Sequence, residues 1–282
     1  MKDLITVAIV YDFDGTLSAG NMQEYEFIPS VGMSKGEFWG EADKIAISND
    51  ADSVLSYMAT MLSAARRCGT PITAALLREM GGHIKLFEGV EEWFERINSY
   101  GEQRGVRIKH YVNSSGIREM IEGSPIADRF HKIYASSFLY DERGEAYWPA
   151  VAINYTNKTQ FIFKINKGVE SVNDSTLVNE YVPREQRPIP FERIIFVGDG
   201  LTDIPSMSLV HNFGGHAIAV YDPERDSKRK EMMQLIREGR AGYVCPADYS
   251  LNSSIDRIVD GIIDKIVADE KLNCLRDASV VE

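Results

Sequence analysis

The sequence predicts an α/β fold in which a doubly wound parallel sheet carries a small helical domain. From about Gly105 onward, apolar runs with the composition of strands alternate with segments of helical periodicity, which is typical of parallel strands joined by crossover helices. Before that point, one strand-like run at residues 5–11 is followed by a stretch of helical signals. We therefore expect a core domain made of residues 1–18 and 85–282, and a helical domain made of residues 19–84.

The first predicted strand ends in two carboxylates. Residues 5–11 are mostly apolar, and Asp12 and Asp14 follow with Phe13 between them. Because side chains alternate along an extended chain, both acids leave the same face while Phe13 points into the core. Two like charges so close favour a cation between them, and oxygen ligands suit Mg²⁺. The alternative from these residues alone is an Asp-Gly turn at Gly15 with solvated acids.

The predicted helical domain contains signals for several helices. Ser34 and Glu37 form a capping-box pattern, which predicts a helix start. An apolar stripe at helical spacing predicts a second helix, and Thr70 followed by Pro71 is expected to open a third. The stripe consists of Val54, Leu55, Met58, Met61, Leu62 and Ala65. Residues 89–99 then return the chain to the core domain as a helix with a buried apolar face.

A second strand is predicted at residues 106–113, and it leads into Ser114 and Ser115. We expect a helix over residues 116–122 directly after it. A small hydroxyl donor beside the N–H groups of a helix start can bind a phosphoryl oxygen. The alternative is an ordinary helix cap, since serine is common there.

Acidic side chains also follow a later strand. Residues 191–197 have the β-branched and aromatic content of a strand, and Asp199 and Asp203 come directly after it in the run Gly-Asp-Gly-Leu-Thr-Asp. Further strands are expected near residues 217–220 and 243–244. Between the second strand and this one, residues 135–155 are expected to form a hairpin beside the sheet.

These strand-end motifs, in this order, resemble those of the haloacid dehalogenase (HAD) superfamily, beginning with Asp-Phe-Asp-Gly-Thr at residues 12–16. The helical domain lies where the phosphoserine-phosphatase-like branch has its cap. The resemblance covers nearly the whole chain. It implies an HAD-like Rossmannoid core with a helical cap, and the activity of a Mg²⁺-dependent phosphatase.

The resemblance also implies a role for each motif residue. Asp12 would be the nucleophile and Asp14 the general acid and base, while Ser114, or less favourably Ser115, would bind the substrate phosphate. Asp12, Asp14 through its backbone carbonyl, and Asp199 would hold the metal, with Asp203 keeping the metal shell or a lysine in place.

The family also has a lysine that binds both the nucleophile and the phosphate, and residues 157–168 offer three candidates. Lys158 is our choice, because it stands at the amino end of a predicted helix from which it can reach back over the sheet. Lys164 and Lys167 lie further along that helix, where a solvated helix face is the better interpretation.

Composition and charge limit the partners. A net charge of −11 argues against a nucleic-acid partner, because binding a phosphate backbone depends on clustered Lys and Arg. No apolar run approaches the roughly 20 residues that span a bilayer, and the amino terminus lacks a signal-like segment, so we expect no membrane partner and a cytoplasmic location. Three scattered cysteines imply no disulfide framework. The sequence does not predict an oligomeric state.

The sequence therefore favours a Mg²⁺-dependent hydrolase that acts on a small phosphomonoester through an aspartyl-phosphate intermediate. One alternative is a phosphotransferase or mutase, which would use the same residues. Another is a phosphoserine phosphatase specifically, although Asn21 stands where those enzymes carry a Glu. A non-enzyme alternative is a phospho-ligand sensor, which the intact acids argue against. Five residues of the cap are candidates for contact with the leaving group, and a solvated or packing role explains each equally well: Met22, Glu24, Arg66, Arg67 and Arg78.

Overall fold

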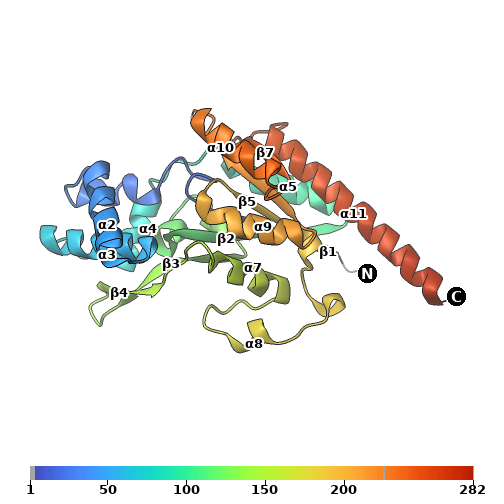
Figure 1. Cartoon of the computed structure of the whole chain (residues 1–282), viewed down its shortest axis with the longest axis horizontal. Coiled ribbons are helices and arrows are strands. Elements are labelled where there is room, and N and C mark those ends of the chain that lie inside the picture. Colours follow the sequence, from blue (N-terminus) through green and yellow to red (C-terminus); the bar gives the residue numbers. More distant parts are fainter. Residues whose placement is uncertain (1–3, 225, 282) are drawn as a thin grey trace.

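The computed structural model describes residues 4–224 and 226–281, so residues 1–3, 225 and 282 of the predicted core domain lie outside the described part. Figure 1 shows a central sheet with helices on both faces, a group of helices at one end and a long carboxyl-terminal helix at the other. The strands are β1 (Ile5–Tyr11), β2 (Val106–Ile117), β3 (Lys132–Tyr140), β4 (Ala146–Val151), β5 (Ile194–Gly198), β6 (His216–Tyr221) and β7 (Tyr243–Pro246). The helices are α1 (Phe27–Ser30), α2 (Lys35–Asn49), α3 (Ser53–Cys68), α4 (Ala74–Gly81), α5 (Val90–Glu102), α6 (Arg118–Glu122), α7 (Lys158–Lys167), α8 (Thr176–Asn179), α9 (Ile204–Asn212), α10 (Asp226–Arg237) and α11 (Ser254–Val281).

The sheet confirms the predicted fold class. Its strand order is β4-β3-β2-β1-β5-β6-β7, and every neighbouring pair is parallel except β3 and β4, which form an antiparallel hairpin. Strand β1 lies between β2 and β5, so the chain reverses its direction of winding there. The carboxyl ends of β1, β2 and β5 therefore meet at one edge of the sheet, which is where ligands bind in open α/β sheets.

Strand β1 is buried on both faces because helices cover both sides of the sheet. Val7 and Ile9 pack in one apolar cluster with α5 and α11, and Ala8 and Val10 pack in another with α7, α9 and α10. This alternation follows from the two-residue period of a strand. It also explains the nearly continuous apolar sequence, which is typical of a central parallel strand.

Helices α1–α4 and the short 3₁₀ helix η1 (Met22–Glu24) form the insert after β1. Its two connections to the core run side by side, with an antiparallel bridge between Ser18 and Leu86.

The capping box at the start of α2 is present, since Glu37 N–H donates to Ser34 Oγ at 3.3 Å and Ser34 N–H donates to Glu37 Oε2 at 2.8 Å. The apolar stripe lies on α3, where all its members are buried except Leu55.

The prediction that Thr70 and Pro71 open a helix is wrong. Helix α4 begins at Ala74, after the cap residue Thr73. The preceding residues pair with the β3-β4 hairpin instead, because the Ile72 carbonyl accepts a hydrogen bond from Ala146 N–H at 2.7 Å. A partner distant in sequence therefore determines the backbone conformation here.

Two other element boundaries differ from the predictions. Strand β2 continues to Ile117, with an irregular register after Ser114, so the helix that was expected from residue 116 begins at Arg118. The strand expected from residue 191 begins at Ile194, after a short 3₁₀ turn.

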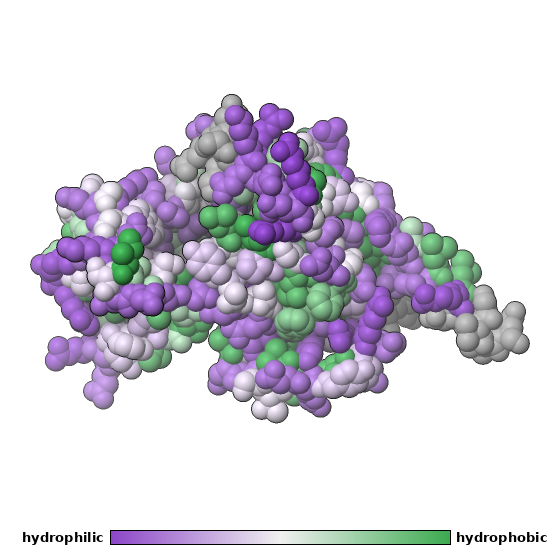
Figure 2. Space-filling view, in the orientation of Figure 1, coloured by the Kyte–Doolittle hydropathy of each residue, from purple (hydrophilic) through white to green (hydrophobic). Residues whose placement is uncertain are grey.

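The face of the molecule in Figure 2 is largely hydrophilic, with hydrophobic residues in separate groups. Within residues 4–224 and 226–281, no helix combines the length and the apolar character needed to cross a membrane.

Candidate active site

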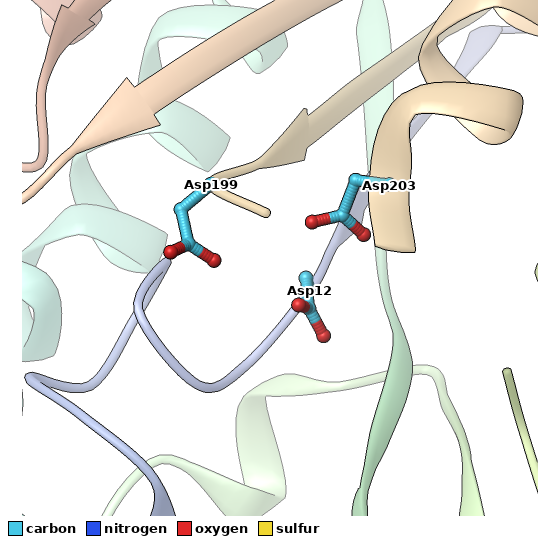
Figure 3. A group of neighbouring side chains, drawn as sticks. All are labelled: Asp12, Asp199 and Asp203. Carbon is cyan, nitrogen blue, oxygen red and sulfur yellow. The ribbon is translucent and has the colours of Figure 1, made fainter. Parts of the chain in front are cut away.

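Three carboxylates meet at the edge of the sheet. Asp12 follows β1, Asp199 follows β5, and Asp203 ends the 3₁₀ helix η5 (Leu201–Asp203). Figure 3 shows their side chains pointing toward a common space, and one carboxylate oxygen from each lies within 4.8 Å of the others. The parallel arrangement of β1 and β5 brings these distant segments together.

The turn after Asp12 requires glycine. Gly15 has φ +77°, a left-handed conformation that L side chains rarely adopt. A Cβ at this position would also lie 2.2 Å from Asp199 Oδ2. Gly15 thus lets the β1 turn approach the Asp199 carboxylate, which no other residue type would allow without movement.

Lys158 joins two of the carboxylates from the first position of α7. Its ammonium Nζ lies 3.1 Å from Asp12 Oδ1 and 2.7 Å from Asp203 Oδ1, and the side chain is fully buried. Burial acts to lower the pKa of this ammonium, but the adjacent charges of Asp12 and Asp203 raise it above its usual value. The lysine is therefore charged throughout the physiological range.

Asp203 uses both of its carboxylate oxygens. Oδ1 accepts from Lys158, and Oδ2 accepts from Gly200 N–H at 3.0 Å. Burial, and then the charge of Asp12, raise the pKa of Asp203 to about 6 despite the lysine. These contacts suit a residue that positions Lys158.

The prediction that Lys164 and Lys167 lie on a solvated helix face is wrong for Lys164, which is 1% exposed. Its ammonium donates to the carbonyls of Ser171 and Asp174 at 2.9 and 2.7 Å. Lys167 donates to the carbonyl of Val178 at 2.7 Å. Both lysines hold the segment that follows α7, away from the carboxylates.

Asp14 is held just beyond the Asp12 carboxylate. Its Oδ1 accepts hydrogen bonds from Met22 N–H at 3.0 Å and from Ser18 Oγ at 3.4 Å. Burial, followed by the charge of Asp12, raises the pKa of Asp14 well above its usual value. A carboxyl group with a raised pKa can hold a proton near neutral pH, as a general acid must.

The two serines at the end of β2 have different surroundings. Ser114 Oγ accepts a hydrogen bond from Gly116 N–H at 3.0 Å and lines the same cavity as Asp12 and Asp14. Ser115 also lines this cavity, but its Oγ is buried and has no hydrogen-bond partner among the described residues, while the Ser115 carbonyl accepts from Tyr57 Oη at 2.5 Å. Ser114 is therefore the better placed of the two to meet a bound anion, while the buried Ser115 Oγ lacks a partner among the described residues.

The donor set fits a hard divalent cation. Asp12, Asp14, Asp199 and Asp203 bring four carboxylates together with one ammonium, that of Lys158. Such a group of like charges is unfavourable without a further cation. Carboxylate and carbonyl oxygens are the ligands that Mg²⁺ takes in proteins.

A cavity of about 380 Å³ opens above this floor, and helices α2 and α3 form its opposite wall. The floor contributes Asp12, Asp14, Ser114, Ser115 and Asp199. The insert contributes, among others, Asn21, Gln23, Trp39, Asp43, Val54 and Tyr57. Sequence reasoning missed most of this wall, although Trp39 and Asp43 stand one helical turn apart and so share a face of α2.

None of the five candidate contacts for the leaving group lines this cavity: Met22, Glu24, Arg66, Arg67 and Arg78. Arg67 forms an ion pair with Glu41 at 2.8 Å and Arg78 with Glu122 at 2.7 Å, both largely exposed and outside the cavity lining. Glu24 accepts hydrogen bonds from Asn21 and Trp39 rather than lining the cavity itself. Glu24 thus holds two lining residues in place, whereas Arg67 and Arg78 contact none of them through these pairs.

Known proteins resemble this chain in sequence and in fold. The family model described as haloacid dehalogenase-like hydrolase matches residues 9–208. An uncharacterized protein of Borreliella burgdorferi is 28% identical over 287 residues, which cover 92% of this chain and 96% of that protein.

Solved structures share the fold at lower identity. An HAD family hydrolase from Salmonella enterica serovar Typhi is 18% identical with a TM-score of 0.54, covering 86% of this chain and 68% of that one. A substrate-bound phosphoserine phosphatase is 16% identical with a TM-score of 0.53, covering 85% of this chain and 92% of that one.

Proposed function

The chain belongs to the haloacid dehalogenase-like hydrolase family, and we propose that it hydrolyses a small phosphomonoester in a Mg²⁺-dependent reaction through an aspartyl-phosphate on Asp12. The observation that carries this proposal is the buried ammonium of Lys158 between Asp12 and Asp203, beside a cavity of about 380 Å³. A fixed positive charge at that place would attract a phosphate group and hold the carboxylate that attacks it. The similar fold of a phosphoserine phosphatase also supports a phosphatase site at this edge of the sheet.

Each residue of the floor has a chemical role in this proposal. The Asp12 carboxylate attacks phosphorus, so an oxygen–phosphorus bond forms to Asp12 and the bond to the alcohol breaks. Asp14, whose raised pKa favours the protonated form, gives its proton to the departing alkoxide. Asp14 then takes a proton from the water that attacks the aspartyl-phosphate, which releases phosphate and restores both acids.

The remaining groups stabilise charge. Lys158 and the Ser114 hydroxyl would donate to the phosphoryl oxygens, with Ser115 as a further donor. Asp12, Asp199 and the backbone carbonyl of Asp14 would hold Mg²⁺, with Asp203 behind them. Bound there, the ion would neutralise charge on the transferring phosphoryl group.

The insert lies over the cavity, where a lid would lie. We assign residues 19–84 to a cap domain and residues 1–18 and 85–282 to the core, because the two connections pair at Ser18 and Leu86. A wall made by α2 and α3 over the floor would exclude water and contact the leaving group. The substrate would be a small molecule rather than a nucleic acid. The exposed free thiols of Cys68 and Cys274 suit a reducing compartment such as the cytoplasm.

The test is hydrolysis of p-nitrophenyl phosphate and a panel of natural phosphomonoesters by the purified full chain. We expect release of inorganic phosphate with Mg²⁺, loss of activity in excess chelator, and recovery when Mg²⁺ is added back. Ca²⁺ should substitute poorly because it prefers a larger and looser oxygen shell. Full activity in chelator would contradict the mechanism, and no phosphate release under any condition would contradict the function.

Asp14→Asn provides a sharper test of roles. Esters with good leaving groups need little protonation, so their hydrolysis should suffer less than that of alkyl esters, and the aspartyl-phosphate should accumulate. Equal loss for leaving groups of very different acidity would argue against this role for Asp14.

A further inference from the structure

The wall of the cavity that belongs to the insert has an unusual charge pattern. Among the described residues that line the cavity, none is Lys or Arg, and Asp43 carries the only charged side chain from the insert. Lys158 lies beneath the floor, where Asp12 and Asp203 hold it. The wall opposite the floor thus presents one negative and no positive side chain, which favours a positively charged group there.

Two aromatic rings form a corner in the same wall. The ring centroids of Trp39 and Tyr57 are 6.0 Å apart, and the ring planes are inclined by 68°. Each ring is held by its polar atom, since Trp39 Nε1 donates to Glu24 Oε1 at 3.0 Å and Tyr57 Oη donates to the Ser115 carbonyl at 2.5 Å. Aromatic rings at such angles attract alkylammonium groups through their electron-rich faces.

A buried acceptor completes the pattern. Gln23 lines the cavity and is 2% exposed, and its Oε1 has no hydrogen-bond partner among the described residues. A buried carbonyl oxygen without a donor is costly, and because Gln23 lines the cavity, an N–H or O–H of a bound ligand would satisfy it. An ammonium group supplies such donors, and a carboxylate does not.

We propose that the leaving group of the substrate is a short alcohol that carries an ammonium group and no carboxylate, with Asp43, Trp39 and Tyr57 selecting the cation. This inference rests on the proposed phosphomonoester hydrolysis. A leaving group with a carboxylate would face Asp43 without a basic residue in the lining to pair with it. Arg66, Arg67 and Arg78 of the insert lie outside the lining, and Arg67 and Arg78 pair with Glu41 and Glu122.

The experiment compares kcat/KM for three esters in the presence of Mg²⁺. O-phosphoethanolamine carries the ammonium, n-propyl phosphate is its neutral analogue of equal length, and O-phosphoserine adds a carboxylate. From one exposed ion pair and one cation–π contact we expect O-phosphoethanolamine to exceed n-propyl phosphate by about tenfold. O-phosphoserine should fall below O-phosphoethanolamine.

Substitutions in the cavity wall test which residues cause the preference for the ammonium ester. Asp43→Asn should lower the ratio of O-phosphoethanolamine to n-propyl phosphate by about threefold, because it removes one exposed charge. Trp39→Leu should lower this ratio by about threefold through loss of the ring. Asp50→Asn, the same chemical change at the end of α2 outside the cavity lining, should leave the ratio unchanged.

The outcomes separate this inference from the proposed function. Equal kcat/KM for the ammonium and neutral esters, with p-nitrophenyl phosphate hydrolysed, overturns the cation preference and leaves the phosphatase standing. A preference for O-phosphoserine, or a ratio unaffected by both Asp43→Asn and Trp39→Leu, also overturns it. If no ester is hydrolysed, p-nitrophenyl phosphate included, the proposed function fails and the inference fails with it.

Discussion

Beneath the floor of the cavity, the Lys158–Asp203 ion pair is fully buried, whereas the Arg67–Glu41 pair of the insert lies at the surface. In the floor, Lys158 and Asp203 have no exposed side-chain surface, and each contacts more than one partner. In the insert, Arg67 and Glu41 form a bidentate pair, but their side chains are 53% and 33% exposed.

The difference in burial between these ion pairs suits the two regions to different functions. A buried ion pair has a fixed geometry and a strong local field, as required for chemistry on a phosphoryl group. An ion pair exposed to water contributes little to stability, so its residues can be substituted at a small cost in the free energy of unfolding. The floor therefore suits catalysis, while the insert can vary its wall residues to select substrates. Substitutions in the floor, the surrounding core and the insert test this contrast.

The largest effect should come from Asp12→Asn. The amide keeps the shape of the side chain but is a poor nucleophile, so we expect turnover to fall by about 10⁴-fold or more. Initial rates with p-nitrophenyl phosphate measure this, and circular dichroism checks the fold. Asp50→Asn serves as the matched control. A loss of less than about tenfold would mean that Asp12 is not the nucleophile.

Lys158→Met and Lys164→Met compare two buried lysines on one helix. Removing Lys158 leaves Asp12 and Asp203 unpaired, which should lower the free energy of unfolding by about 3–5 kcal/mol and abolish activity. Lys164→Met should destabilise the fold through loss of its two carbonyl contacts but keep the activity of the remaining folded protein.

Urea unfolding and rate assays on the same samples separate stability from catalysis for these lysines. If Lys164→Met abolished the activity of folded protein and Lys158→Met did not, our choice of lysine would be wrong.

The stability of the core should fall in acid because one histidine, His110, is buried there in the neutral form. His110 Nδ1 lies 3.1 Å from Tyr11 Oη, and its Nε2 lies 3.0 Å from Asn98 Oδ1. Trp93 donates to Tyr11 Oη, which leaves the Tyr11 hydroxyl proton for an acceptor, and a neutral imidazole that accepts at Nδ1 and donates from Nε2 to Asn98 fits these contacts. Burial lowers the pKa of His110 from 6.5 to about 3.

Between these two pKa values the unfolded state binds a proton that the folded state does not. The free energy of unfolding should thus fall with decreasing pH, by up to about 1.4 kcal/mol per unit from this histidine alone. Urea unfolding at pH 6.5, 5.5 and 4.5 measures the slope, and His110→Gln should reduce it. An equal slope in both proteins would contradict the assignment.

The smallest effect should come from Arg67→Gln. Because the pair with Glu41 is exposed, we expect the free energy of unfolding to change by less than about 1 kcal/mol. The ranking of phosphate esters should stay the same, since Arg67 lies outside the cavity lining. A changed ranking would show that the insert acts on the substrate from a distance.

The sequence alone determined the features that depend on neighbours in the chain. The apolar run before Asp12 predicts a buried strand, and the capping box at Ser34 predicts the start of α2, because strand period and helix capping are local effects. Parallel strands also end at a common edge, so the meeting of Asp12 with Asp199 could be expected from topology. The start of α4 could not be predicted from the sequence, because Ile72 pairs with the distant β3-β4 hairpin instead of entering a helix.

The sequence favoured Lys158 among the three lysines, but only the tertiary structure decided where Lys164 points and which side chains of the insert face the carboxylates. Lys158 and Lys164 are both buried on α7, yet one points to Asp203 and the other to backbone carbonyls, because packing of the helix on the sheet sets the direction of each side chain. Trp39 and Tyr57 form their corner only when α2 packs on α3. Contacts between distant segments depend on how whole elements pack, and local sequence patterns do not encode that geometry.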